Sequence, residues 1–201
     1  MEKYYYNFTK LFNFLTFVLA ILSFISLQVQ PISSAKTPPS YTNFIKNKCN
    51  NTTYPTVCIK TLYPYASYVK TNSIRLCKAA LNIAIQGTDN AARTIAKLAH
   101  QKGISHIEAA AFKDCIYDVK DEISELKRTL NAMEHLRGAD RKFEWANAKT
   151  WASAAITDAE SCMDGFSKTK VNPAVRTKIR SCLSDEEKLI SNALALINHL
   201  Y

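Results

Sequence analysis

The sequence predicts an all-α protein, an up-down-up-down four-helix bundle over residues 71–201 preceded by a short helical hairpin over residues 41–70. Three observations predict this fold. Apolar residues recur in steps of three and four along four long segments, the spacing of helices that each bury one face. The 201-residue chain has no proline between Pro64 and Pro173, so nothing interrupts the first three helices. Its four glycines are too few for the tight turns of a β-sandwich or barrel.

Residues 1–35 are typical of a secretory signal peptide, which is removed from the mature protein. Two lysines within the first ten residues precede the apolar stretch Leu11–Leu27, and small residues lead to a cleavage site after Ala35. The alternative is an uncleaved membrane anchor. However, this stretch has 17 residues with four polar interruptions, whereas a spanning helix needs about 20 apolar residues. We therefore predict a secreted protein with no membrane segment after cleavage, and a loose tail over residues 36–40.

The predicted hairpin consists of two short helices. The aromatic and aliphatic residues from Tyr41 to Ile45 indicate the first. Thr53 followed by Pro55 supplies a cap and a first turn for the second. Pro64 ends that helix, because proline removes a backbone donor and clashes with the preceding turn.

Each of the four predicted bundle helices carries one apolar seam, a row of residues separated by three or four positions. Such seams are buried between the antiparallel helices of a bundle. The seams run from Ile74 to Leu98, from Phe112 to Met133, from Trp145 to Phe166 and from Val175 to Leu200. The second consists of Phe112, Ile116, Val119, Ile123, Leu126, Leu130 and Met133. The fourth contains Cys182 and Leu189, with Glu186 as its one polar member.

Glycine and proline positions agree with these helices. Gly103, Gly138 and Gly165 lie near the ends of the first three, where a residue that tolerates positive φ commonly caps a helix. Pro173 precedes the fourth, an ordinary position for a helix start. Gly87 is the exception, because it lies inside a helix at a cost of about 1 kcal/mol relative to alanine.

The sequence predicts no catalytic residues, no metal site and no cofactor. The motifs G-x-S-x-G, H-E-x-x-H and C-x-x-C are all absent, and the four histidines belong to no comparable pattern. The formal net charge is +9. The predicted signal peptide carries two lysines and one glutamate, so the mature chain would carry +8. Secretion and the scattered placement of lysine and arginine argue against a nucleic-acid partner.

Secretion also decides how two other features are interpreted. An oxidising compartment makes the six cysteines a question of disulfide pairing. Asn50 and Asn51 each open an N-x-T sequon, so we expect at most one glycan there, on a surface loop.

The cysteine spacing and several short motifs together carry a family resemblance. The order and spacing of these cysteines and motifs resemble the four-cysteine signature of the plant invertase and pectin methylesterase inhibitor family. The resemblance covers essentially the whole mature chain. Eight residues separate Cys49 from Cys58. The matching parts are Phe44-Ile45 through Cys49, Asn51–Cys58 (NTTYPTVC), Ala111–Cys115 (AFKDC), Trp151–Cys162 (WASAAITDAESC) and Ser191–Ala195 (SNALA).

The resemblance implies an enzyme inhibitor that docks over the substrate cleft of its target, in the extracellular apoplast or cell wall. It implies two disulfides, Cys49–Cys58 within the hairpin and Cys115–Cys162 between bundle helices. Cys77 and Cys182 depart from the four-cysteine pattern. They are either core thiols that behave as small hydrophobes or a third disulfide that joins the first and last bundle helices.

The target is either pectin methylesterase or acid invertase. The invertase-inhibiting branch of the family carries a Pro-Lys-Phe element, and this chain has Arg141-Lys142-Phe143, without the proline. The Trp151–Asp158 run looks more like the pectin methylesterase branch, which we therefore favour. A second class of function is a non-inhibitory helical protein that binds wall polysaccharide. The net positive charge permits weak, salt-sensitive contact with acidic pectin, or it serves only solubility.

Two polar stripes are candidates for the target-binding face. The acidic stripe lies opposite the Ile116–Leu126 part of the second seam and consists of Asp114, Asp118, Asp121 and Glu125. Like charges at this spacing repel by about 0.2–0.5 kcal/mol per pair, so a partner would explain their retention. The small polar stripe on the next helix consists of Asn147, Thr150, Thr157 and Ser161, with Ala154 among them. The alternative is a solvated acidic face beside a helix that packs sideways.

Overall fold

The computed structural model describes residues 37–168 and 170–201, and these residues are largely helical. The predicted signal peptide at residues 1–35 lies outside the described residues. None of the described helices is long and apolar enough to cross a membrane. In chain order the elements are α2 (Pro39–Cys49), α3 (Pro55–Leu62), the 3-10 helix η1 (Tyr63–Tyr65), α4 (Ala66–Val69), α5 (Ser73–Ala99), α6 (His106–Glu134), α7 (Arg141–Lys168) and α8 (Pro173–Asn198).

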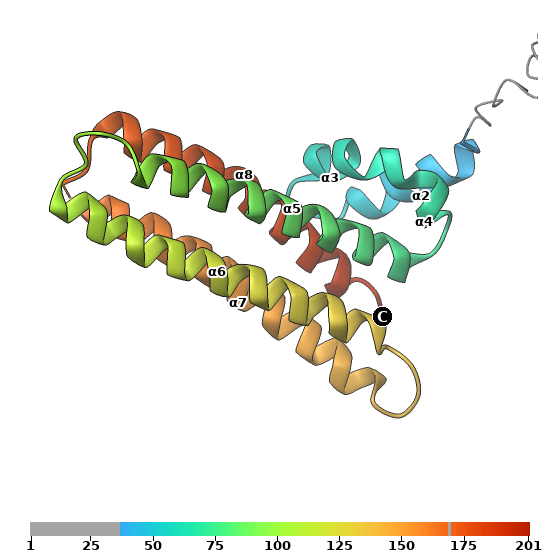
Figure 1. Ribbon diagram of the computed structural model, residues 1–201. Coiled ribbons are helices and arrows are strands. Elements are labelled where there is room, and N and C mark those ends of the chain that lie inside the picture. The colour runs from blue at the N-terminus through green and yellow to red at the C-terminus, as the bar shows by residue number, and fades with distance from the viewer. Residues whose placement is uncertain (1–36, 169) are drawn as a thin grey trace, which may run out of the picture. The chain divides into compact units, whose positions relative to one another are not determined.

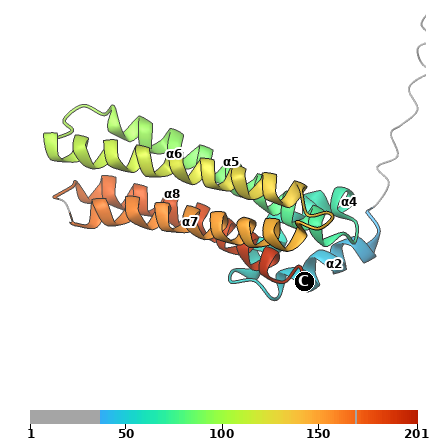
Figure 2. The ribbon, with the colours of Figure 1, turned by 90° about the horizontal axis from the view of Figure 1, so that it is seen from below.

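The four long helices α5 to α8 form the bundle, and the predicted fold is confirmed. α5 packs beside α8, and α6 packs beside α7 (Figure 1). The view turned by 90° shows α6 and α7 side by side along most of their length (Figure 2). Gly103 lies in the loop between α5 and α6, and Gly138 lies in the loop between α6 and α7, with φ of 85° and 72°. Only glycine adopts such angles without steric cost.

The N-terminal hairpin packs against the end of the bundle where α5 begins and α8 ends (Figure 1). α2 begins at Pro39, inside the stretch that we predicted as a loose tail. A proline fits the first turn of a helix because the N–H that it lacks would have no helical partner there. α3 begins at Pro55 as expected, and Pro64 lies in η1, after α3 has ended.

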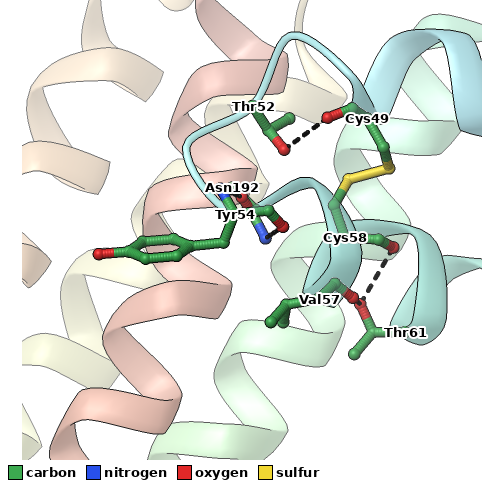
Figure 3. The surroundings of a disulfide bond; sticks show 7 residues. All are labelled: Cys49, Thr52, Tyr54, Val57, Cys58, Thr61 and Asn192. Carbon is green, nitrogen blue, oxygen red and sulfur yellow. Dashed lines mark hydrogen bonds between the residues drawn. A yellow bond between two sulfur atoms is a disulfide. The ribbon is translucent and has the colours of Figure 1, made fainter.

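One side chain of α8 holds the hairpin to the bundle (Figure 3). Asn192 Oδ1 accepts the backbone N–H of Tyr54 at 2.8 Å, and its Nδ2 donates to the carbonyl of Tyr54 at 3.0 Å. Tyr54 is thus the cap residue of α3, where we expected Thr53, and no side chain of its own caps that helix. The Cys49–Cys58 disulfide closes the hairpin next to this contact. The hairpin is therefore fixed both to itself and to α8.

The seams predict most of the core, with errors on α8 and α6. On α8 the predicted Cys182 and Leu189 are only half-buried, and the residues that follow them, Leu183 and Ile190, are buried instead. On α5 and α7 the predicted positions are buried except for the first of each, Ile74 and Trp145. On α6 the residues Ile116, Ile123 and Leu130 are only half-buried, and the residues that precede each of them are buried instead. Those residues are Cys115, Glu122 and Thr129. The cause is that α6 packs more extensively against α7 than against α5, so its buried face is rotated toward α7.

Gly87 lies close to a side chain of α8, which the sequence did not reveal. A Cβ atom at this position would lie 2.7 Å from the Cδ1 atom of Leu189 on α8. Real Cβ atoms essentially never approach a neighbour so closely. The nearest atom is the end of a flexible, half-buried leucine side chain, so an alanine here would require Leu189 to turn aside, and not α5 and α8 to separate.

Two carboxyl groups are buried in the middle of the bundle. Glu122 of α6 and Glu186 of α8 are both almost completely buried. Thr88 of α5 donates its hydroxyl to Glu122 Oε1 at 2.8 Å. Burial raises the pKa of Glu122 to about 8, and burial together with the neighbouring Glu122 raises the pKa of Glu186 to about 9. At neutral pH the pair therefore holds at least one proton, which one carboxyl group can donate to the other.

Candidate functional site

The candidate site lies on the outer face of α6 and α7, which hold each other closely. Four alanines of α7 are fully buried, and their small side chains let the two helices approach; they are Ala148, Ala152, Ala155 and Ala159. The Cys115–Cys162 disulfide joins the helices, with 4.4 Å between the Cα atoms. Phe112 and Phe166 pack edge to face beside it, with ring centroids 5.0 Å apart. Side chains on this face therefore keep a fixed relation to one another.

We expected the acidic stripe to lie opposite the buried face of α6, and it does not. Asp114 and Asp121 are exposed, but Asp118 and Glu125 are half-buried on the side of α6 that faces α7. Their position follows from the rotation of α6, because they occupy the turn beside the buried Cys115 and Glu122. Asp158 of α7, which we did not predict, joins the same cluster.

The cluster concentrates negative charge in a partly desolvated position. The pKa of Asp158 is raised to about 6, first by burial and then by the charges of Asp121, Glu125 and Asp118. The pKa of Asp118 is also raised, first by burial and then by Asp114 and Asp121. Such mutual repulsion is unfavourable in the free protein. A cationic or proton-donating partner would relieve it.

One end of the cluster carries a cation. Arg128 Nη1 pairs with Glu125 Oε1 at 3.3 Å, and its guanidinium lies 5.0 Å from the ring centroid of Trp151 on α7. The Glu125 carboxylate is thereby partly neutralised, and the arginine also covers an aromatic surface. The uncompensated negative charge is accordingly centred on Asp114, Asp118, Asp121 and Asp158.

The small polar stripe of α7 lies at the surface, as expected. Thr150, Thr157 and Ser161 are exposed, and Asn147 is half-buried. Each of the three hydroxyl groups donates to the carbonyl four residues earlier in α7, at 2.9–3.3 Å. The hydroxyl protons are therefore used inside the helix, and the stripe offers acceptor oxygens and methyl groups to a partner.

The two stripes meet in one groove. This groove has a volume of about 310 Å³, lies between α6 and α7, and has the Cys115–Cys162 disulfide in its wall. It brings together Asp114, Asp118 and Ser161. The other predicted residues of the face do not line it: Asp121, Glu125, Asn147, Thr150 and Thr157. Asp114 also borders a second groove of about 470 Å³ between α5 and α6, so it stands on the ridge between the two.

Sequence reasoning missed two large apolar side chains on the outer surface of α6, and it considered Phe143 of α7 only as part of the Arg141–Phe143 element. Ile107, Tyr117 and Phe143 are 56%, 66% and 65% exposed. Ile107 lines the first groove and Tyr117 the second. Their signal in the sequence is that they fall outside the seams of their helices. Exposed apolar groups beside a charged cluster are a common composition for a protein-binding surface.

Cys77 and Cys182 are free thiols, so the third disulfide is absent. Cys77 is buried as predicted, whereas Cys182 is only half-buried. Leu183 occupies the buried position beside it. Burial raises the pKa of the Cys77 thiol to about 12 and that of the Cys182 thiol to about 11. Thiols with such pKa values are poor nucleophiles.

The described residues contain no group of three or more histidine, cysteine, aspartate or glutamate side chains that could hold a metal ion. The four histidines are exposed and lie at helix termini: His100, His106, His135 and His199. The arrangement thus offers a rigid, charged and partly apolar face, which is suited to binding another protein.

Comparison with known proteins agrees with this description. Residues 43–196 match the family model described as plant invertase/pectin methylesterase inhibitor. The chain is 35% identical over 193 residues to "Pectinesterase inhibitor 4" of Arabidopsis thaliana, covering 93% of this chain and 97% of that protein. It is 34% identical to "Pectinesterase inhibitor 3" of the same plant, covering 79% of each. It is 33% identical to the "21 kDa protein" of Daucus carota, covering 84% of this chain and 88% of that one.

Solved structures show the same fold. A mutant form of a pectin methylesterase inhibitor from Arabidopsis matches with a TM-score of 0.59 at 18% identity, covering 78% of this chain and 97% of that one. A second crystal structure, of a pectin methylesterase inhibitor from Arabidopsis thaliana, matches with a TM-score of 0.55 at 16% identity. The bundle and its hairpin therefore have a known structural counterpart.

Proposed function

Because this chain belongs to the plant invertase/pectin methylesterase inhibitor family, we propose that it is a non-catalytic inhibitor of pectin methylesterase that controls the de-esterification of pectin. The similarity to a pectinesterase inhibitor over 93% of this chain and 97% of that relative carries the proposal. The predicted signal peptide supports action outside the cell, in the apoplast and cell wall.

The α6–α7 face is the proposed contact with the enzyme. A cleft that accepts a polyuronide must accommodate negatively charged sugar residues. The cluster of Asp118, Asp121 and Asp158 presents negative charge, the same sign as those sugar residues carry, on a rigid surface. The face would thus cover the cleft by electrostatic complementarity, with Ile107 and Tyr117 supplying apolar contact beside it.

The test is a titration of the refolded, oxidised protein against purified pectin methylesterase and acid invertase in parallel. We expect stoichiometric inhibition of pectin methylesterase that persists at moderate salt. Inhibition of invertase alone would instead assign the function to the other branch, with the exposed Phe143 as the first residue to examine. Inhibition of neither enzyme would reject the inhibitor function.

The location of the face is tested with a pair of charge reversals. Asp118→Lys with Asp121→Lys should weaken inhibition at least about tenfold. These changes should not lower the melting temperature, because they relieve repulsion around Asp158. The matched control is Asp89→Lys with Asp185→Lys, which changes the net charge equally on α5 and α8. If both pairs reduce inhibition alike, or neither does, the binding face lies elsewhere.

Secretion and glycosylation are tested on the protein as it is exported. We expect a mature N-terminus after Ala35 and at most one glycan in the turn between α2 and α3. Asn50 and Asn51 are both exposed there. Thr52 is buried and donates its hydroxyl to the carbonyl of Cys49 at 2.8 Å, whereas Thr53 is exposed. We therefore expect Asn51, whose sequon uses Thr53, to carry the glycan.

A further inference from the structure

The end of the bundle that holds the hairpin is strongly basic, in contrast to the α6–α7 face. Between Thr37 and Thr88 the chain has six lysine and arginine residues and no aspartate or glutamate. These residues form the hairpin and the first half of α5. The net positive charge of the protein is therefore concentrated at one end, while the acidic cluster lies on another surface. Charge that is segregated in this way can serve two different partners.

A pocket at the basic end gathers part of this charge. It has a volume of about 260 Å³ and lies between α4, the start of α5, and the end of α6 with the loop that follows. Three cations and one carboxylate line it: Arg75, Lys78, Arg137 and Glu134. Lys78 Nζ pairs with Glu134 Oε1 at 3.0 Å. Two exposed guanidinium groups therefore remain in excess at the rim.

The position of Arg75 is unfavourable for the helix that carries it. Arg75 lies in the first turn of α5, which contains no acidic residue, and the N-terminal end of a helix disfavours a cation. Its Nη1 atom donates to the carbonyl of Tyr68 at 3.5 Å, which directs the guanidinium toward the pocket. A cation at this position does not stabilise the helix, so binding of an anionic ligand is the better explanation for Arg75.

One exposed tyrosine, Tyr68, adjoins the cations, and two more are exposed on the same short segment. Tyr63, Tyr65 and Tyr68 project from η1 and α4, and all three are exposed to solvent. Tyr68 is half exposed and lines the pocket itself. A tyrosine ring has an apolar face and a polar edge, so it can pack on the C–H face of a sugar ring. An arginine fork binds a carboxylate with two parallel hydrogen bonds.

From this juxtaposition we propose that the hairpin end is a binding site for an acidic polysaccharide built of uronic acids. Arg75 and Arg137 bind the carboxylate of one sugar residue at the pocket, and Tyr68 packs on its ring. The neighbouring lysines of the hairpin attract the rest of the chain. This activity is separate from inhibition, because it uses the hairpin end and not the α6–α7 face. Its consequence is that the inhibitor is retained on de-esterified pectin while its acidic face stays free.

The test measures binding of the oxidised protein to oligogalacturonates by calorimetry, with fully methyl-esterified oligomers as the uncharged comparison. We expect binding of the acid form only, and weakening of that binding as salt is raised. Arg75→Gln with Arg137→Gln should reduce affinity about tenfold, and Tyr68→Ser should reduce it several-fold. The matched control is Arg93→Gln with Lys102→Gln, which removes the same charge at the far end of α5 and should leave affinity nearly unchanged.

Two results would overturn the proposal. One is equal loss of affinity in the control pair, which would show that net charge alone attracts the polymer. The other is absence of oligogalacturonate binding, including the case in which anionic phospholipid vesicles bind instead. Inhibition of pectin methylesterase is measured on the same variants. We expect Arg75→Gln with Arg137→Gln to keep full inhibition, so a failure of this site is distinguished from a failure of the inhibitor function.

Discussion

The buried pair of Glu122 and Glu186 makes the stability of the bundle depend on pH in an unusual direction. Both carboxyl groups have pKa values of about 8 and 9 in the folded protein, against an ordinary value of 4.5. The folded state therefore binds more protons than the unfolded state across this interval. A raised pKa contributes stability that is fully present below the unfolded value and is lost as pH rises toward the folded value. We expect the free energy of unfolding to fall steadily from about pH 4.5 to pH 8.

The magnitude follows from proton linkage. Each carboxyl that keeps its proton only in the folded state lowers the free energy of unfolding by about 1.4 kcal/mol per pH unit. From pH 5 to pH 7, one such proton corresponds to about 3 kcal/mol. For a chain of this size that is a fall in melting temperature of about 6–12 °C. Asp158 of α7 acts in the same direction on Glu122, and Glu187 does so on Glu186.

The decisive variant is Glu186→Gln, which preserves shape and cannot ionise. Its amide can donate to the carboxylate of Glu122, which then needs no proton of its own. We expect a melting temperature close to that of the natural chain at pH 5, a higher one at pH 7–8, and a slope with pH at most half as steep. Calorimetry between pH 5 and pH 8 measures all three. Glu160→Gln is the matched control, because Glu160 is exposed on α7. A natural protein with a flat profile, or a variant as steep as the natural chain, would refute the reasoning.

Three further predictions concern packing and the thiols. Gly87→Ala should change stability by less than about 1 kcal/mol, because the better helix propensity of alanine is offset by the turn that the half-buried Leu189 side chain must make. A urea titration measures this, and a loss of more than about 2 kcal/mol would show that Leu189 cannot turn aside. Asn192→Ala should lower the free energy of unfolding by about 1–3 kcal/mol, because it leaves two backbone groups of the hairpin unpaired. Faster hydrogen exchange in α3 is the readout. Unfolding without reductant should expose two thiols to titration, Cys77 and Cys182. In the folded protein both should react slowly with a thiol reagent. A single reactive thiol in the unfolded protein, or none, would show additional pairing.

The spacing of apolar residues predicted the four helices and their order, but not the rotation of each helix about its own axis. On α5 the predicted seam is the row that is buried between α8 and α6. On α6 the packing against α7 is more extensive than the packing against α5, and the buried row shifts by one residue to include Cys115 and Glu122. A row that contains a glutamate does not look apolar in the sequence. Periodicity alone therefore places this face wrongly by part of a turn.

The same rotation explains what the sequence showed of the candidate site. The acidic residues of α6 were recognised as unusual, since like charges recur there at helical spacing. Asp158 was not, because its neighbours in the cluster belong to another helix and the contact depends on how α6 and α7 are turned. The basic pocket was likewise missed as a site, since Arg75 and Arg137 are far apart in the chain. Long-range juxtapositions of this kind require the packed structure.

The position of the Cys115–Cys162 bond divides the exposed loops into two kinds with respect to proteases. A cut in the loop between α6 and α7, for example after Arg137, leaves both fragments covalently joined, because the bond spans that loop. The acidic face would survive such a cut. A cut after Lys102, between α5 and α6, leaves two fragments that no disulfide joins, so only noncovalent packing holds them together. Resistance to proteolysis would then depend on the connections that neither disulfide spans, α5–α6 and α7–α8, so shortening the α5–α6 loop should lengthen the lifetime of the protein only if that loop is cut first.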